Sequence, residues 1–406
     1  MVKVVNWKLN LAVLFFGQFF VMAGMSMISP FLPFYLQELG VTDTHQVALW
    51  ASLIFSANFI TSFIFQPIWG KVADKRGRKI MLLRSGFGMA VCIGLMGFAA
   101  NPWWLFFLRL LNGTIAGFNP AAVSLISATV PRERTGFAMG ILQSGGVAGT
   151  ILGPLMGGLL AGWVGYRPIF YITGSLLFMA SLLALLFVKE KFNAAKAAKQ
   201  PQISIIKGFV QLSKIRQLPA LFTVTLLIQF ALLSTMPLIP LFVQELHGQD
   251  ALLAFYAGLV TAITGFSNMA ASPLLGRLGD KIGFERILFA SLLGAALTSV
   301  PQAFVTQIWQ LMTARFLFGM FLGGLLPSVN ALIRKHTPDG MEARAYSFNQ
   351  SALSLGNLTG PVLGGALSGV IHIQGIFILS ACLFAVNALW VMKMLSGKPT
   401  GKQTAM

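Results

Sequence analysis

The sequence predicts an all-α membrane protein with twelve transmembrane helices arranged in two homologous six-helix bundles. Three observations predict this fold: a composition too apolar for water, a series of apolar runs of membrane-spanning length, and a repeat of the first half in the second. The chain has 406 residues, of which 56% are hydrophobic and 10% are charged, whereas soluble domains carry roughly 25% charged residues. Its two cysteines, Cys92 and Cys382, lie within apolar runs. These features exclude a soluble globule, a disordered chain and a disulfide-rich secreted domain.

Each expected span is an apolar run of about 20 residues or more, the length that crosses the hydrocarbon core as a helix. All are too long for membrane strands. The first run is followed by Glu38 and a second span without a small-residue cleavage site, so we expect a retained helix rather than a signal peptide. The spans are expected at 9–37, 47–70, 80–100, 103–127, 136–162, 167–188, 218–245, 252–275, 287–306, 309–332, 343–369 and 373–395.

The net charge of +18 follows from where the Lys and Arg residues lie. With the N-terminus placed in the cytoplasm, every basic residue except Arg109, Arg167 and Arg315 falls in or beside a cytoplasmic segment. The positive-inside rule therefore predicts a multi-pass protein of the plasma (cell inner) membrane with both termini in the cytoplasm. We expect these charges to contact anionic lipid headgroups rather than nucleic acid.

The longest polar interruption, residues 189–217, predicts the domain organisation. It separates an N-terminal bundle, 1–188, from a C-terminal bundle, 218–406, which ends in a short cytoplasmic tail. The interruption is basic, and the spacing of Ile203, Ile206 and Phe209 suggests a short helix on the inner membrane surface.

Five sequence blocks of the first half recur in the same order in the second half, and the partners stand 206 or 207 positions apart. Parallel repeats of this kind build transporters whose substrate site lies between the two halves near the bilayer midplane. The matched pairs are 29–39 with 236–246, 67–77 with 273–283, 109–117 with 315–323, 143–144 with 350–351, and 149–158 with 356–365.

Three of these blocks carry a resemblance to a known family. The run from Gly70 to Lys79, Gly-Lys-Val-Ala-Asp-Lys-Arg-Gly-Arg-Lys, resembles the loop signature between the second and third helices of the major facilitator superfamily. Residues 105–113 and 149–158 resemble the helix-4 and helix-5 motifs of its twelve-helix drug:proton antiporters. The resemblance covers essentially the whole chain and implies the major facilitator fold.

The same resemblance implies a secondary active transporter that exports amphiphilic drugs or toxic small molecules by proton antiport with alternating access. An importer or facilitator of a sugar, metabolite or organic anion on the same fold stays open. So does a non-transporting membrane sensor, which would belong to a different functional class.

The loop signature is a candidate conformational latch. A carboxylate at Asp74 can pair with Arg78 or Lys79, or cap a helix N-terminus of the facing half. The family implies that such a contact forms only when the cytoplasmic side is closed. The alternative is a topology-setting turn with solvated charges, and it is stronger for Asp280, where Phe284 and Glu285 replace the Arg-Lys pair. The candidate residues are Gly70, Asp74, Gly77, Arg78, Lys79 and Asp280.

Arg109 and Arg315 are expected well inside spans, where a charge costs roughly 2.5–3.5 kcal/mol on insertion scales. Arg109 shares an expected helical face with Asn112 and Asn119. This stripe indicates proton coupling or substrate orientation, and the alternative is a structural hydrogen-bond hub.

None of the eleven acidic residues lies in the middle of a span. Proton carriage is therefore expected at the helix-end acids Glu38, Glu245 and Asp74, at His372, or on the substrate. A strong preference for dications is less expected for the same reason. Amides inside the spans are candidates for the cavity wall, although each could instead bond a neighbouring helix: Gln18, Gln143, Gln229, Asn268, Asn330, Asn349 and Gln350.

The helix-5 motif places small residues on one helix face, which lets helices approach closely. The resemblance makes this motif, Gly149, Gly153, Pro154, Gly157 and Gly158, a marker of antiport. Ordinary close packing is the alternative, and the duplicate at 356–365 supports it.

The sequence has no Gly-x-x-x-x-Gly-Lys-Ser/Thr loop, no metal-ligand cluster and no nucleophile–base pair. We therefore expect no ATP coupling, no enzyme activity, no cofactor and no metal. The expected partners are a small amphiphilic substrate, protons and membrane lipids, and the expected unit is a monomer.

Overall fold

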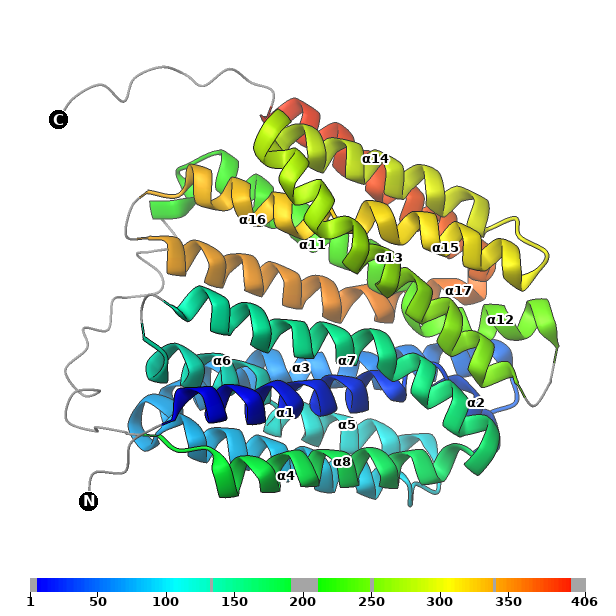
Figure 1. The fold of residues 1–406 in the computed structure, drawn as a ribbon. Coiled ribbons are helices and arrows are strands. Elements are labelled where there is room, and N and C mark those ends of the chain that lie inside the picture. Colours follow the sequence, from blue (N-terminus) through cyan, green and yellow to red (C-terminus); the bar gives the residue numbers. More distant parts are fainter. Residues whose placement is uncertain (1–5, 132–133, 191–210, 249–251, 339–340, 396–406) are drawn as a thin grey trace.

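The computed structural model describes residues 6–131, 134–190, 211–248, 252–338 and 341–395, and these form helices joined by short connections (Figure 1). The all-α fold predicted from the sequence is confirmed. The surface helix expected near 203–210, and most of the expected linker, lie outside the described residues.

Among its described residues, the first bundle contains eight α-helical segments, several of which begin at a side-chain cap. Asn6 accepts hydrogen bonds from the backbone N–H groups of Lys8 and Leu9, and Asp43 accepts one from Gln46. These caps satisfy backbone donors that have no partner within the helix. The segments are α1 (Trp7–Met27), α2 (Leu32–Glu38), α3 (Thr44–Arg76), α4 (Arg78–Met96), α5 (Pro102–Ile115), α6 (Phe118–Thr129), α7 (Thr135–Val164) and α8 (Tyr166–Phe187).

The second bundle repeats this order in the second half of the chain. Its segments are α11 (Gln217–Thr235), the 3₁₀ turn η2 (Met236–Leu238), α12 (Ile239–His247), α13 (Leu253–Ile282), α14 (Phe284–Gln302), α15 (Ile308–Leu322), α16 (Leu325–His336) and α17 (Glu342–Leu395).

Several expected spans are broken rather than continuous. The span 9–37 is α1 followed by α2, with Pro30 in the turn between them, because proline has no N–H to continue a helix. The span 103–127 is α5 followed by α6, broken before Gly117, whose φ of 151° glycine adopts readily. Likewise, 218–245 is α11, η2 and α12, and 309–332 is α15 and α16.

The number of membrane passes agrees with the expected twelve once these breaks are considered. Within the described residues, ten segments are long and apolar enough to span a membrane. One of them, Arg344–Lys393, contains a non-helical residue, His372 (φ 57°, ψ 172°), which divides α17 into the two expected spans 343–369 and 373–395. The pair α5 and α6, each short by itself, supplies the remaining pass.

The two bundles lie side by side, and their ends differ (Figure 1). We call the end where α8 finishes and α11 begins the linker end, and the end that holds α2 and α12 the sealed end. At the sealed end, one hydrophobic core continues from the first bundle into residues 238–260 and 373–377 of the second. Toward the linker end, the second bundle has a separate core of its own. The bundles therefore share buried apolar surface only over part of their length.

Glycine faces on α7 and α17 bring helices into backbone contact. A Cβ added at Gly157 would overlap the carbonyl of Met27 on α1, and one at Gly149 would overlap Phe19. The equivalent glycines Gly356 and Gly364 lie against Leu226 and Ser234 of α11 in the same way. Close packing therefore accounts for much of the helix-5 motif.

Gly157→Val is expected to destabilise the protein, because the added side chain would force α7 away from α1. Overpacking of this kind costs about 1–3 kcal/mol. Gly140→Val on the same helix is the matched control, since a Cβ at Gly140 has no atom within 4 Å. The melting temperature in detergent should fall only for Gly157→Val. Equal melting temperatures for the two variants would show that this contact does not hold α7 in place.

Candidate functional site

One face of α7 contacts the second bundle at the sealed end. Added Cβ atoms at Gly158 and Gly258 would overlap the carbonyls of Ala254 and Pro154, respectively, so the backbones of α7 and α13 touch there. The equivalent Gly365 of α17 faces α3, where an added Cβ would overlap the side chain of Ser52 and lie 3.0 Å from the carbonyl oxygen of Ala48. Four helices, two from each bundle, thus close the sealed end.

The same helix faces are exposed nearer the linker end. On α7, Gln143 and Val147 share the face of Ile151 and Gly158, and both are exposed. On α3, the face of Ser52 continues to the exposed Phe63 and then to Gly70. The bundles therefore diverge, and a cleft between them opens at the linker end.

The walls of this cleft combine apolar side chains with a few amides and hydroxyls. Met269 on α13 is exposed on the face of Gly258, and Gln350 on α17 is exposed at the position equivalent to Gln143. Added Cβ atoms at Gly70 and Gly276, which are equivalent in the repeat, would have no atom within 4 Å. The two loop-signature glycines thus face open space in this conformation.

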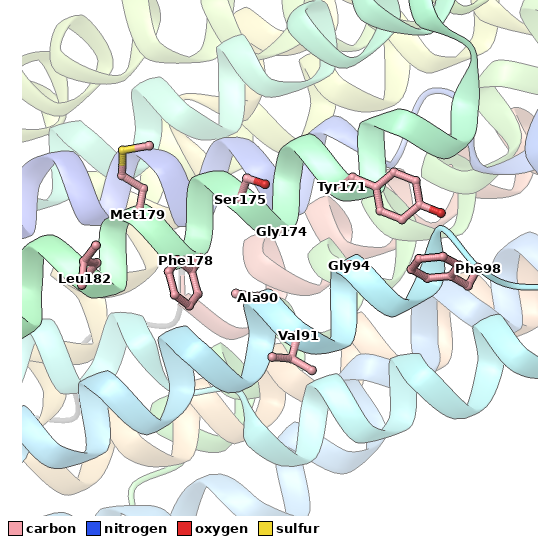
Figure 2. A pocket seen from close by; sticks show the side chains of 10 residues that line it. All are labelled: Ala90, Val91, Gly94, Phe98, Tyr171, Gly174, Ser175, Phe178, Met179 and Leu182. Carbon is pink, nitrogen blue, oxygen red and sulfur yellow. The ribbon is translucent and has the colours of Figure 1, made fainter.

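A second concave feature lies outside the cleft. A groove of about 580 Å³ lies between α4 and α8 and is lined almost entirely by apolar side chains and by Gly94 and Gly174 (Figure 2). Both helices pack against helices of their own bundle. The groove therefore opens on the outer surface of the first bundle, apart from the expected substrate site.

Arg109 is buried, with 6% of its surface exposed, and has no ion pair with a carboxylate among the described residues. Asn112, one turn further along α5, donates to Asn58 Oδ1 of α3 at 2.8 Å. Asn119 lies beyond the break at Gly117, on α6. The single helical stripe expected from Arg109 to Asn119 was therefore wrong, because a positive-φ glycine separates the two helices.

Arg315 is also buried, with 3% of its surface exposed. Its guanidinium carbon lies 5.7 Å from the ring centre of Phe318 and 5.4 Å from that of Phe377. Its Nε and Nη2 atoms have no hydrogen-bond partner within the described part of the chain. The aromatic faces are thus the recorded contacts of this charge, in a geometry that favours a cation.

The expected cavity amides have different environments. Gln143 and Gln350 are exposed on the cleft faces. Gln18 on α1 is buried against α7, where its Cγ would lie 3.2 Å from a Cβ at Gly146. Asn349 accepts a hydrogen bond of 2.6 Å from Thr225 and so joins two helices of one bundle. Asn349 therefore fits the alternative expected for these amides, a hydrogen bond to a neighbouring helix.

The loop signature is held within its own bundle by a residue that the sequence did not indicate. Glu190 accepts hydrogen bonds from the backbone N–H groups of Arg78 (3.1 Å) and Lys79 (2.8 Å), and Lys79 Nζ donates to the carbonyl of Leu185 at 2.8 Å. A carboxylate at this N-terminus of α4 complements the helix dipole. The sequence feature that could have indicated this contact is a single acidic residue at the start of the basic segment after the sixth span.

The acids of the signature lie inside helices rather than after them. α3 runs to Arg76 and α13 to Ile282, so Asp74 and Asp280 belong to the last helical turns, and Gly77 forms the turn with φ 98°. The expected position, in the turn after the helix, was wrong by a few residues because the helix continues through the polar segment. Asp280 is exposed.

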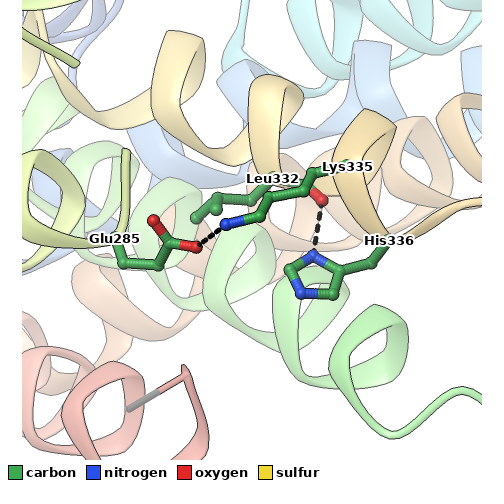
Figure 3. A network of polar contacts seen from close by, with 4 residues as sticks. All are labelled: Glu285, Leu332, Lys335 and His336. Carbon is green, nitrogen blue, oxygen red and sulfur yellow. Dashed lines mark hydrogen bonds and ion pairs between the residues drawn. The ribbon is translucent and has the colours of Figure 1, made fainter. Parts of the chain in front are cut away.

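The second bundle has a different contact at the equivalent place. Glu285, in the first turn of α14, forms an ion pair of 2.6 Å with Lys335 of α16, and His336 Nδ1 lies 2.9 Å from the carbonyl of Leu332 (Figure 3). The residue that replaces a lysine thus pairs with a lysine from another helix of the same bundle.

Arg84 makes a contact that its position in the sequence did not predict. We expected it to be a cytoplasmic topology charge, yet its guanidinium lies 3.6 Å above the ring of Trp69, within the helical part of α4. Trp69 Nε1 donates to the carbonyl of Thr114 at 2.6 Å. The stack joins α4 to α3 and α5 beside the break at Gly117. Neither the spacing nor the composition of the sequence predicts this pair.

The helix-end acids Glu38 and Glu245 lie at the sealed end. Glu38 is exposed, and Glu245 accepts a hydrogen bond of 3.1 Å from Gln374. Both are therefore far from the open end of the cleft and from Asp74.

Two repeated helical bundles with a cleft between them define a polytopic membrane transporter, since a site between parallel repeats is the architecture of such carriers. A family model of the Major Facilitator Superfamily matches residues 14–265 and 253–405, and the chain belongs to this family. The family is one of transporters, which supports the expectation that the chain is not an enzyme.

Curated relatives match nearly the whole chain. The "Multidrug resistance protein MdtG" of Salmonella paratyphi C is 42% identical over 386 residues, which cover 95% of each chain. The protein of the same name from Serratia proteamaculans is 42% identical over 398 residues, covering 98% of this chain and 96% of that one.

Solved structures are similar in fold alone. The nucleoside transporter NupG has a TM-score of 0.78 at 17% identity and covers 97% of this chain and 100% of its own. A bacterial homolog of the human lysosomal transporter Spinster, described as inward-facing and occupied, has a TM-score of 0.76 at 15% identity, covering 95% and 96%.

Glu190→Ala is expected to destabilise the first bundle by about 1 kcal/mol, because two backbone donors at the start of α4 lose a charged acceptor. Asp280→Ala is the matched control, since it removes an exposed acid at the same end. The midpoint of thermal unfolding should fall for Glu190→Ala and stay unchanged for the control. A Glu190→Ala protein as stable as the wild type would show that solvent replaces the cap.

Proposed function

We propose that this transporter exports amphiphilic drugs or other toxic small molecules across the plasma membrane by proton antiport. The observation that carries the proposal is the 42% identity, over 95% of the chain, to proteins named for multidrug resistance. The cleft supports the proposal independently. Alternating access requires a conformation in which the space between the bundles is open at one end and closed at the other, and the cleft has this form.

The chemistry of the cleft favours amphiphilic substrates. Exposed apolar side chains on α3, α7 and α13 can bury the apolar part of a substrate, and the amides of Gln143 and Gln350 can bond its polar part. Apolar walls with a few polar groups are typical of small-molecule sites, and flexible Met-rich walls can repack around different ligands.

The proposal includes an orientation and a domain division. The basic bias of the sequence puts the linker end, and with it both termini, in the cytoplasm. The cleft would then face the cytoplasm, as an exporter needs when it loads substrate. We retain the division into 1–188, 189–217 and 218–406, a monomeric unit, and contacts of the basic residues with anionic lipids.

Coupling to protons would involve groups of opposite charge at different places. Arg109 and Arg315 are buried guanidinium groups that can orient substrate or respond to its charge. Proton carriage would fall to Glu38, Glu245, Asp74 or His372, or to the substrate itself, because the spans carry no acid in their middle. The latch proposal for Gly70, Asp74, Gly77, Arg78 and Lys79 is supported by the open space beyond Gly70 and Gly276, into which the facing bundle could close.

The second candidate is import or facilitated transport of a metabolite, which the similarity in fold to a nucleoside transporter keeps in view. Inverted vesicles from an overproducing strain separate the candidates. Export predicts that a proton gradient drives accumulation of an amphiphilic dye inside these vesicles, and that an uncoupler abolishes it. Vesicles from the strain without the gene are the control. Gradient-independent or oppositely directed movement would favour the second candidate, and no movement of any substrate would favour a sensor.

Arg109→Ala is expected to reduce proton-driven dye accumulation by at least about tenfold, because it removes a buried charge inside a span of the first bundle. Arg109→Lys should retain part of the activity, since lysine keeps the charge but loses the planar five-donor group. The measurement is initial uptake rate per amount of folded protein. Wild-type uptake by Arg109→Ala would assign this residue to structure alone.

A further inference from the structure

A reciprocal pair of side-chain amides joins the two bundles at the sealed end. Gln37 Nε2 on α2 donates to Gln244 Oε1 on α12 at 3.0 Å, and Gln244 Nε2 donates to Gln37 Oε1 at 3.3 Å. Both of the side-chain hydrogen bonds recorded between described residues of different bundles belong to this pair. It is therefore a directional contact beside the close van der Waals packing of the glycine faces.

The two glutamines are equivalent positions of the internal repeat. Gln37-Glu38-Leu39 recurs as Gln244-Glu245-Leu246, 207 positions later. Equivalent residues can bond to one another reciprocally only where an approximate twofold axis passes between them, as in an isologous contact. The pair thus marks the axis that relates the bundles, at the end where they meet.

Local structure brings these side chains to the axis. α2 and α12 are short helices of seven and nine residues, and each has a proline in its first turn. They follow the breaks after α1 and α11, which let the chain turn toward the facing bundle. The first five residues of each helix, 32–36 and 239–243, are buried, whereas the glutamines are half-buried at the rim. They lie beside a cavity of about 350 Å³ that Thr42 and Glu245 also line.

The position of the pair lets it oppose separation of the two bundles. The glycine contacts between α7 and α13 and between α3 and α17 are non-directional and lie deeper in the interface. The amide pair lies at the edge, where separation of the bundles would begin. Once apart, both amides would reach water and keep hydrogen bonds, so neither conformation leaves a buried polar group unpaired.

We propose that Gln37 and Gln244 form a latch that holds the sealed end closed. The latch opens in the exchange of conformation in which the linker end closes and the sealed end opens. The exchange rests on the proposed transport function, whereas the latch itself is a property of the closed conformation. Its loss should shift the equilibrium toward the conformation open at this end.

The separation of the bundles can be measured without substrate or a proton gradient. Spin labels at Phe98 and Phe304 report it, because these residues are equivalent in the repeat, lie at the sealed end of their bundles, and are 72% and 70% exposed. The labels are introduced as cysteines in full-length protein carrying Cys92→Ala and Cys382→Ser, reconstituted in lipid. Pulsed dipolar spectroscopy then gives the distribution of distances.

In Gln37→Ala, the ratio of long to short distances should rise about tenfold, which corresponds to about 1.4 kcal/mol. Gln37→Ala/Gln244→Ala should resemble the single variant, because the second change removes a group whose partner is already gone. Gln37→Glu/Gln244→Glu should raise the long-distance fraction most, through repulsion. Gln37→Glu/Gln244→Lys should restore the short distance.

Gln374→Ala is the matched control, since it removes an amide at the same end whose hydrogen bond to Glu245 stays within one bundle. The proposal is overturned if neither Gln37→Ala nor the double glutamate variant raises the long-distance fraction, or if Gln374→Ala raises it equally. If the variants shift the distances as expected but the wild-type protein transports nothing, only the proposed function is contradicted. Normal proton-driven transport with unshifted distances would contradict only the latch.

Discussion

Backbone contact along glycine faces determines how the helices of this protein are arranged. α7 has one such face toward α1, through Gly149, Gly153 and Gly157, and another toward α13 of the facing bundle, through Gly158. α17 repeats both, toward α11 and toward α3. Without side chains to separate them, these helices lie close enough for van der Waals contact between backbones to hold them.

The cleft follows from the unequal lengths of these two faces. The face toward its own bundle extends along most of α7, so the bundle stays intact. The face toward the other bundle is in contact only at the sealed end and is exposed from Val147 toward the linker end. A bundle built in this way can tilt against its partner as a unit, because its own packing does not depend on the interface that opens.

Much of the fold could be predicted from the sequence, because membrane thickness fixes span length and the repeat fixes span order. The positions of Arg109 and Arg315 inside spans were correct for the same reason. The break at Gly117 was missed, since a single glycine within an apolar run looks like part of a continuous helix. Contacts between distant segments were also missed: Glu190 on α4, Arg84 on Trp69, and the pairing of Gln37 with Gln244. The repeat showed that the two glutamines are equivalent, but not that the axis passes between them.

The amide pair at the sealed end carries no net charge, and this has an electrical consequence. Moving one elementary charge across a membrane potential of 100 mV involves about 2.3 kcal/mol. An arginine–carboxylate latch near the membrane surface would also respond to salt and to the surface potential, whereas two glutamines respond to neither. A membrane potential therefore acts on the charged groups of this carrier and not directly on the contact between Gln37 and Gln244.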